Sequence, residues 1–275
     1  MQKIEYQLII SDFDGTLVKA DGTVSQETKQ TIRQYIEDGG KFAISTGRMP
    51  KAIISRAREL GLKGVVCCSQ GAVIVDIETE EVLLEGRVPN ETAIKICEKM
   101  ESLGLHIHVY DLWEYYSNMD DEPLKMYESI IKQKAKLVLD KPMSTFLRET
   151  KISPFKVLAM VAPKDNARVL AALENEAFES CYTTRSSVYL VEVGNLNYSK
   201  GTSVEFLANL YDIPIDKTIA IGDQLNDLSM IELAGLGIAV KNADEELKKQ
   251  AFTFEYTNEE DAVAKIIKRY GYKEL

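Results

Sequence analysis

Short apolar segments alternate with helical patterns at both ends of the chain, and this alternation limits the fold more than any other feature. The apolar segments lie at residues 8–10, 41–44, 64–68, 218–221 and 237–240. The helical patterns lie at residues 25–37, 50–60, 202–211 and 225–234, with a last one that ends near residue 269. Because buried strands that alternate with helices are typical of parallel sheets, we expect an α/β core with a doubly wound, Rossmann-like parallel sheet.

The middle of the chain has a different pattern. Its strand patterns, at residues 106–110 and 155–160, alternate with helical patterns at residues 91–102, 124–134 and 166–177. This arrangement predicts an α+β domain inserted into the core. We therefore divide the chain into a core, residues 1–83 and 194–275, and an inserted cap, residues 84–193.

The charge balance of the chain excludes several classes of partner. The 275 residues include 33 Lys and Arg against 43 Asp and Glu, a formal net charge of −10. Since an acidic surface repels nucleic acids and anionic membranes, we expect neither as a partner, and a phosphate ligand needs a local positive feature. No uncharged apolar segment approaches the roughly 20 residues of a membrane helix, and no signal peptide is recognisable. The four cysteines form no CxxC pair, so we expect reduced thiols and a cytoplasmic protein.

Two acidic residues follow the first apolar segment. Asp12 and Asp14 are two positions apart, so on a strand their side chains point the same way, toward the edge where open α/β sheets bind ligands. Such a pair suits a metal site, or a nucleophile with an acid/base partner. A simple surface turn at Asp14-Gly15 is an equally good interpretation of this segment alone. A calcium loop is excluded because its glycine belongs at the sixth position, which is Leu17.

A second acidic segment favours the metal site. The apolar segment at residues 218–221 leads directly into Asp223, with Asp227 four positions later. In a doubly wound sheet both strands end at one edge, so the four carboxylates of Asp12, Asp14, Asp223 and Asp227 are expected to converge. Like charges about 4 Å apart repel by roughly 4 kcal/mol at an effective dielectric constant near 20, so a cation must balance them. Oxygen ligands favour Mg²⁺, which in such sites commonly binds phosphate as well.

Two further segments offer groups for a phosphate. Ser45-Thr46-Gly47-Arg48 follows a strand and precedes a helix, which places a hydroxyl and free backbone N–H groups at the same edge. A helix N-cap explains this segment equally well. Lys200 lies just before a helix, where a cation opposes the helix dipole, and this favours a functional role.

In this order, the residues resemble the four motifs of the haloacid dehalogenase superfamily. The matching segments are Asp12-Phe13-Asp14-Gly15-Thr16-Leu17, Thr46-Gly47-Arg48, Ser199-Lys200-Gly201, and Gly222-Asp223 with Asn226-Asp227. The insertion between the second and third motifs resembles the cap of the Cof-type phosphatases of that superfamily. The resemblance implies an Mg²⁺-dependent phosphatase that acts on small phosphorylated metabolites. Hexose or pentose phosphates are the first candidates, followed by pyridoxal phosphate and flavin mononucleotide.

The resemblance also implies a role for each motif residue. Asp12 would attack phosphorus and form an aspartyl-phosphate, and Asp14 would act as acid and then base. Thr46 and Lys200 would bind the phosphoryl oxygens. The other expected phosphate or substrate contacts are Gly15, Gly47, Arg48 and Asn226. The expected metal ligands are Asp12, Asp14 through its carbonyl, Asp223 and, in support, Asp227.

Two positions depart from the family pattern. Gln70 in Ser69-Gln70-Gly71-Ala72 stands where relatives commonly have Asn, and Lys241 stands where a Gly is common. Both departures bear on the fit of the substrate rather than on catalysis. A phosphosugar mutase of the same superfamily and a non-catalytic sensor that binds a phosphometabolite are alternative functions, and the oligomeric state is left open.

Overall fold

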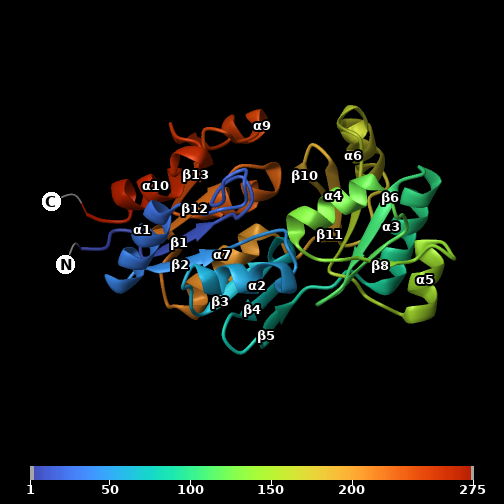
Figure 1. Ribbon diagram of the computed structural model, residues 1–275, viewed down its shortest axis with the longest axis horizontal. Helices are drawn as coiled ribbons and strands as arrows, with labels where there is room; N and C mark the ends of the chain where they lie inside the picture. The colour runs from blue at the N-terminus through green and yellow to red at the C-terminus, as the bar shows by residue number, and fades with distance from the viewer. Residues whose placement is uncertain (1–2, 274–275) are drawn as a thin grey trace.

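The computed structural model describes residues 3–273, which form three sheets with helices packed around them (Figure 1). The central sheet has five strands in the order β14-β13-β12-β1-β2, and all neighbouring strands are parallel. These strands are β1 (Leu8–Ser11), β2 (Lys41–Ile44), β12 (Thr218–Gly222), β13 (Leu236–Ala239) and β14 (Phe252–Thr253). The strand β1 pairs with β2 at one of its edges and with β12 at the other. The carboxyl ends of β1 and β12 therefore flank the switch point at which open α/β sheets bind ligands.

Helices from both ends of the chain cover this sheet. The helix α1 packs against α10, and α7 packs against α8. The helices of the core are α1 (Gln26–Glu37), α2 (Pro50–Glu59), α7 (Lys200–Leu210), α8 (Leu228–Leu233), α9 (Glu245–Lys248) and α10 (Ala262–Tyr270), with 3-10 turns η1 (Ser69–Gly71), η3 (Ile215–Lys217), η4 (Leu225–Asp227) and η5 (Asn258–Glu260). Leu8, Ile9 and Ile10 of β1 are fully buried, which stabilises the sheet by roughly 1.5–3 kcal/mol per side chain. The expected α/β fold with a parallel sheet is confirmed.

A small antiparallel sheet continues the core beyond β2. It consists of β3 (Val65–Cys68), β4 (Val73–Asp76) and β5 (Val82–Glu85). A single parallel bridge between Ser45 and Cys67 joins the end of β2 to β3. Of the four free cysteines, Cys67, Cys68 and Cys97 are buried and Cys181 is partly buried.

The third sheet belongs to the middle of the chain and forms the other half of the molecule in Figure 1. Its strand order is β10-β11-β9-β6-β7-β8, antiparallel except between β7 and β8. The strands are β6 (His106–Tyr110), β7 (Tyr115–Ser117), β8 (Lys136–Leu137), β9 (Lys156–Met160), β10 (Cys181–Ser187) and β11 (Leu190–Asn195). The helices are α3 (Asn90–Ser102), α4 (Glu122–Ile131), α5 (Met143–Thr150) and α6 (Asn166–Glu174), with the 3-10 turn η2 (Pro163–Asp165).

The division into core and cap stays a proposal. Strands between residues 106 and 195 lie in the six-stranded sheet, and those of residues 8–85 and 218–253 lie in the other two sheets. The proposed limits at 83/84 and 193/194 fall inside β5 and β11. Residues 1–2 and 274–275 of that division lie outside the described part of the chain. Among the described residues, no helix has the length and apolar character needed to cross a membrane.

Several elements differ from the sequence-based expectation, and those not predicted are β4, β5, β7, β8, β10, β11, β14, α5 and α9. The helix expected over residues 225–234 is divided into η4 and α8, because the Asp227 side chain accepts hydrogen bonds from backbone N–H groups just before it. The helix α7 begins at Lys200, earlier than expected, because Ser199 acts as its N-cap in a capping box with Thr202. The strand β10 was not predicted, since its polar sequence has no apolar alternation.

Candidate active site

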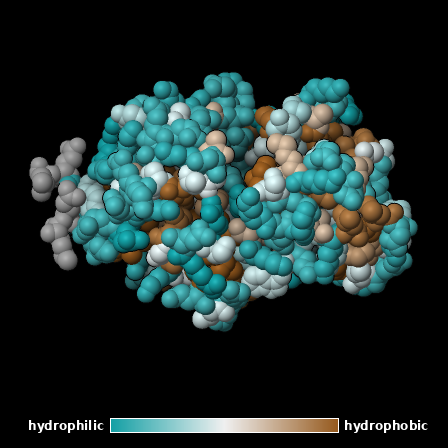
Figure 2. Space-filling view, viewed as in Figure 1, coloured by the Kyte–Doolittle hydropathy of each residue, from teal (hydrophilic) through white to brown (hydrophobic). Residues whose placement is uncertain are grey.

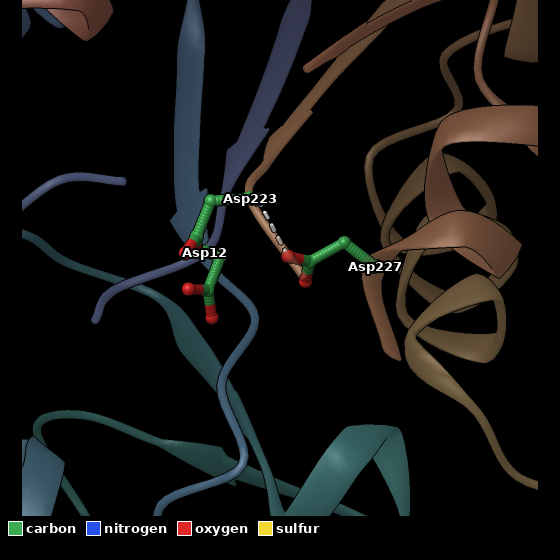
Figure 3. A group of neighbouring side chains, drawn as sticks. All are labelled: Asp12, Asp223 and Asp227. Atoms are coloured by element: carbon green, nitrogen blue, oxygen red, sulfur yellow. Dashed lines mark hydrogen bonds between the residues drawn. The ribbon is translucent and has the colours of Figure 1, made fainter. Parts of the chain in front are cut away.

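Three carboxylates meet at the switch point of the central sheet. Asp12 follows β1 and Asp223 follows β12, two strands that pair in register at Ser11 and Ile221. Asp227 reaches the same place from η4. One carboxylate oxygen from each of Asp12, Asp223 and Asp227 lies within 4.8 Å of the other two, and all three residues are buried (Figure 3). The structure therefore brings together three of the four acidic residues expected at this edge.

Lys200 supplies the only positive charge that contacts these carboxylates among the described residues. It is the first residue of α7, is 1% exposed, and forms ion pairs with Asp12 and, at 2.5 Å, with the Asp227 Oδ1. Burial lowers the pKa of Lys200, but these two carboxylates outweigh burial and raise it above its usual value. Lys200 is therefore a permanent cation at the base of the site.

One lysine does not balance three carboxylates. Burial raises the pKa of Asp12 well above its usual range in spite of Lys200. Burial, with the nearby Asp227, raises the pKa of Asp223 to about 7. Burial is the main cause of both shifts, and the single Lys200 ammonium does not offset it. Three oxygen donors with unbalanced negative charge fit a small divalent cation such as Mg²⁺.

Short-range contacts hold Asp223 and Asp227 in place. The Asp227 Oδ2 accepts hydrogen bonds from the backbone N–H groups of Asp223, at 2.8 Å, and Gln224, at 2.9 Å. Thr16 Oγ1 donates to the Asp223 Oδ1 at 2.8 Å. Gly15 has a φ of +81°, and a Cβ at this position would lie 2.4 Å from the Asp223 Oδ2. The Gly15 position therefore requires glycine for both its backbone conformation and its contact with Asp223.

The Asp14 side chain lies apart from the other three carboxylates. Both of its oxygens accept hydrogen bonds from the Arg48 guanidinium at 2.7 Å, and the Asp14 side chain is 48% exposed. Burial lowers the pKa of Arg48, but Asp14 raises it to a net value above normal. The Arg48 guanidinium also lies 5.1 Å from the centre of the Phe13 ring. The expected convergence of all four side chains is thus not seen, because Arg48 binds Asp14.

The loop of Thr46, Gly47 and Arg48 lies beside Asp12, as the sequence predicts. Thr46 is 1% exposed and its N–H donates to the Cys67 carbonyl at 2.9 Å. The backbone N–H of Arg48 donates to Thr46 Oγ1 at 3.2 Å. All three residues line the same cavity as Asp12 and Asp14. A phosphate at Asp12 would therefore contact this loop.

The cavity has a volume of about 1210 Å³ and lies between the end of the central sheet and the cap. From the cap, Lys156 of β9 and Glu192 of β11 line it next to the polar loop. The lining also includes apolar residues, among them Met126 and Ile130 of α4, which are 67% and 52% exposed. Figure 2 shows further apolar residues in patches on the half of the molecule that carries α4, α5 and α6. The cavity has room for a small organic phosphate ester.

The remaining residues singled out from the sequence lie at different positions relative to the cavity. Asn226 lines the cavity, and its Nδ2 donates to the Gln70 Oε1 at 2.9 Å. His106 also lines the cavity, whereas His108 is fully buried, and burial lowers the pKa of both. Lys241 is exposed.

Sequence reasoning missed Lys156 and Glu192. Lys156 begins the otherwise apolar strand Lys-Val-Leu-Ala-Met, Glu192 lies in the apolar stretch Leu-Val-Glu-Val of β11, and each is nearly fully buried. A buried charge in an apolar strand needs a partner. A lone charged residue in an apolar strand is therefore the sequence signal that could have identified both residues.

Comparison with known proteins agrees with this geometry. The family model for haloacid dehalogenase-like hydrolases matches residues 9–267. The chain belongs to this family. Phosphatase YwpJ of Bacillus subtilis is 29% identical over 283 residues, which cover 95% of this chain and 99% of that protein.

Solved structures of the family have the same fold. A haloacid dehalogenase-like hydrolase from Bacteroides thetaiotaomicron has a TM-score of 0.81 at 29% identity, with 96% of this chain and 99% of that chain covered. The subclass IIB sugar phosphatase BT4131 has a TM-score of 0.82 at 21% identity, with 96% and 99% covered, which is a likeness of fold. The predicted membership in the Cof-type group and the predicted phosphoric monoester hydrolase activity are confirmed.

We expect Mg²⁺ to raise the melting temperature more at about pH 8 than at about pH 6. Without a divalent cation the folded protein holds the proton of Asp223 more tightly than the unfolded chain does, because its pKa is raised to about 7. The stability that this proton contributes is complete at low pH and is lost as the pH rises through about 7. Since Mg²⁺ binds the ionised carboxylate, its stabilising effect grows over the same range.

Calorimetric melting curves with and without Mg²⁺ measure this difference, which should reach about 2 °C or more. The Asp223→Asn variant is the control, because position 223 then cannot ionise and the dependence of the Mg²⁺ effect on pH should become smaller. An equal Mg²⁺ shift at both pH values in the wild-type protein would contradict the expectation.

We expect Gly15→Ala to weaken Mg²⁺ binding by about tenfold or more. The new Cβ would overlap the Asp223 Oδ2, and the positive φ adds strain. Gly22→Ala is a matched control, because Gly22 has a φ of +78° and nothing within 4 Å of an added Cβ. Titration calorimetry of both variants with Mg²⁺ separates the effect of the overlap with Asp223 from the effect of backbone strain. Similar losses of affinity in both variants would show that backbone strain, not contact with Asp223, is responsible.

Proposed function

We propose that the protein is an Mg²⁺-dependent phosphatase that hydrolyses small phosphorylated metabolites, such as sugar phosphates, through an aspartyl-phosphate intermediate on Asp12. The observation that carries this proposal is the group of Asp12, Asp223 and Asp227 beside Lys200, with Asp12 and Thr46 lining one cavity. We further propose that it acts in the cytoplasm as an enzyme of free small molecules, without nucleic acid or membrane partners.

Asp12, Asp223 and the carbonyl of Asp14 would hold the Mg²⁺ ion, with Asp227 in support. When bound, the ion would neutralise charge on the phosphoryl oxygens and on the carboxylates. Lys200 and the Thr46 hydroxyl would donate hydrogen bonds to the phosphoryl oxygens and fix the phosphorus atom in front of Asp12.

In the first step, an Asp12 carboxylate oxygen attacks phosphorus, and the bond from phosphorus to the ester oxygen breaks. Protonated Asp14 gives its proton to the departing alkoxide, which leaves as a neutral alcohol. In the second step, ionised Asp14 takes a proton from water as the water oxygen attacks the aspartyl-phosphate. Asp12 is released as a carboxylate together with inorganic phosphate.

The contact with Arg48 can determine where the Asp14 side chain lies. In the structure Arg48 holds Asp14 as an exposed carboxylate. A bound phosphate dianion would compete for the guanidinium, because phosphate is also a good bidentate acceptor. Arg48 would then exchange Asp14 for a phosphoryl oxygen, and the Asp14 side chain would be free to turn toward the leaving group.

We expect Asp12→Asn to lower the rate of phosphate release by at least about a thousandfold, because an amide is a far weaker nucleophile than a carboxylate. The measurement is release of inorganic phosphate, with Mg²⁺, from a panel of several dozen phosphate esters that includes sugar phosphates and p-nitrophenyl phosphate. Turnover by Asp12→Asn at the wild-type rate would exclude the covalent mechanism.

The same panel separates the alternatives. A phosphatase releases phosphate from simple aryl esters without added sugar bisphosphate, whereas a mutase returns the phosphoryl group to a sugar. Tight binding of one ester without turnover of any would indicate a sensor instead of an enzyme.

A further inference from the structure

A buried ion pair in the cap lies directly against the phosphate-site loop of the core. Lys156 of β9 and Glu192 of β11 have side chains that are each 3% exposed, and the Lys156 Nζ lies 3.0 Å from the Glu192 Oε2. Both residues line the cavity. Their strands are antiparallel neighbours in the six-stranded sheet, so the cap sheet fixes the pair.

Each member of the pair also binds the core. The Lys156 Nζ donates a hydrogen bond to the Gly47 carbonyl at 2.8 Å. The Glu192 Oε2 accepts a hydrogen bond from the Gln70 Nε2 at 3.0 Å. Within the cap, Ser186 Oγ donates to the Glu192 Oε1 at 2.5 Å. The pair therefore links the six-stranded sheet to the Gly47 loop and to the turn η1, which are distant from it in the sequence.

The contact between Lys156 and Gly47 fixes the orientation of one peptide group. The Gly47 carbonyl and the Arg48 N–H belong to the same trans peptide unit, so they point in opposite directions. With the carbonyl turned toward Lys156, the Arg48 N–H donates to Thr46 Oγ1. Because Thr46 Oγ1 accepts this bond, its own hydroxyl proton is directed elsewhere and can be donated to a phosphoryl oxygen.

Gln70 holds the same loop from the other side. Its backbone has a φ of 63° and its N–H donates to the Thr46 carbonyl at 3.1 Å. Its side chain crosses Gly47 so closely that a Cβ on that glycine would lie 2.7 Å from the Gln70 Nε2. A shorter Asn side chain could not reach Glu192 from this backbone position.

We propose that Lys156 is a positioning residue for the phosphate site, which sets the Gly47–Arg48 peptide and through it the Thr46 hydroxyl, and that Glu192 and Gln70 hold Lys156 in place. This inference rests on the proposed function, since it assumes that Thr46 binds the phosphoryl group. The phosphate loop is therefore complete only when the cap is seated on the core.

Stability alone does not account for the pair. Charged pairs that are buried stabilise a fold little, because removing both charges from water offsets their attraction. Burial raises the pKa of Glu192, but Lys156, Ser186 and Gln70 outweigh it and lower the pKa below its usual value, so the carboxylate stays ionised. A permanent charge at Glu192 keeps the Lys156 ammonium directed toward the loop.

The test compares variants that remove the Lys156 contact with one that removes a different link between cap and core. Lys156→Met keeps the length of the side chain but leaves Glu192 unpaired, so the double variant Lys156→Met/Glu192→Gln is included to avoid an isolated buried charge. Arg185→Met is the matched control, because Arg185 of β10 forms an ion pair at 2.5 Å with Asp244 of the core instead of with the Gly47 carbonyl. Thermal melting verifies that each variant is folded.

The readout is the inhibition constant of inorganic phosphate, measured with p-nitrophenyl phosphate as substrate, together with KM for esters of unrelated alcohols. We expect both Lys156 variants to raise the inhibition constant and every KM by about tenfold, which corresponds to the loss of one charged hydrogen bond. Arg185→Met should stay within about twofold. Gln70→Asn, which keeps the left-handed turn, should give a smaller rise, about threefold, in the same direction.

Three results would overturn the proposal. These are an unchanged inhibition constant in both folded Lys156 variants, an equal rise in Arg185→Met, or a rise in KM for only one ester. If the wild-type protein hydrolyses no ester, the proposed function fails. Calorimetric titration with inorganic phosphate then still decides whether Lys156 sets the phosphate loop.

Discussion

Negative charge concentrated at the end of two parallel strands is the constraint on which the candidate site depends. Asp12, Asp223 and Asp227 are buried within 4.8 Å of one another, and Lys200 offsets part of their charge. The surrounding backbone is adapted to this arrangement, with the N–H of Asp223 directed at Asp227 and with glycine at position 15 beside Asp223. Burial of these carboxylates favours either a bound proton, as the raised pKa of Asp223 indicates, or an additional cation, which we propose to be Mg²⁺.

Much of the core site could be predicted from the sequence because it depends on local rules. Asp12 and Asp223 each follow a short apolar strand, and parallel strands end at one edge, so their proximity follows from the strand pattern. Lys200 is marked by its unfavourable place at a helix start. The pairing of Asp14 with Arg48 could not be predicted, because motif spacing places Asp14 at the site without showing which cation its side chain binds.

The contacts between cap and core were beyond sequence reasoning for a different reason. Lys156 and Glu192 come from β9 and β11 and Gln70 from the turn η1, and no periodic pattern relates the positions of their side chains. The polar strand β10 was missed because its seven residues are all partly buried rather than alternately buried and exposed. Such contacts depend on how segments that are distant in the sequence align with one another. The sequence shows only that a lone lysine and a lone glutamate interrupt apolar strands.

The order of strands in the central sheet also affects how the chain reaches its native state. β1, near the N-terminus, has β2 on one side and β12 on the other, and Leu8 pairs with Thr218. A growing polypeptide that has emerged only as far as β11 contains every strand of the six-stranded sheet, while β1 still has an open edge. Closing that edge requires a contact across most of the chain, which slows folding. During synthesis, Asp12 and Asp223 therefore cannot come together until most of the chain has been made.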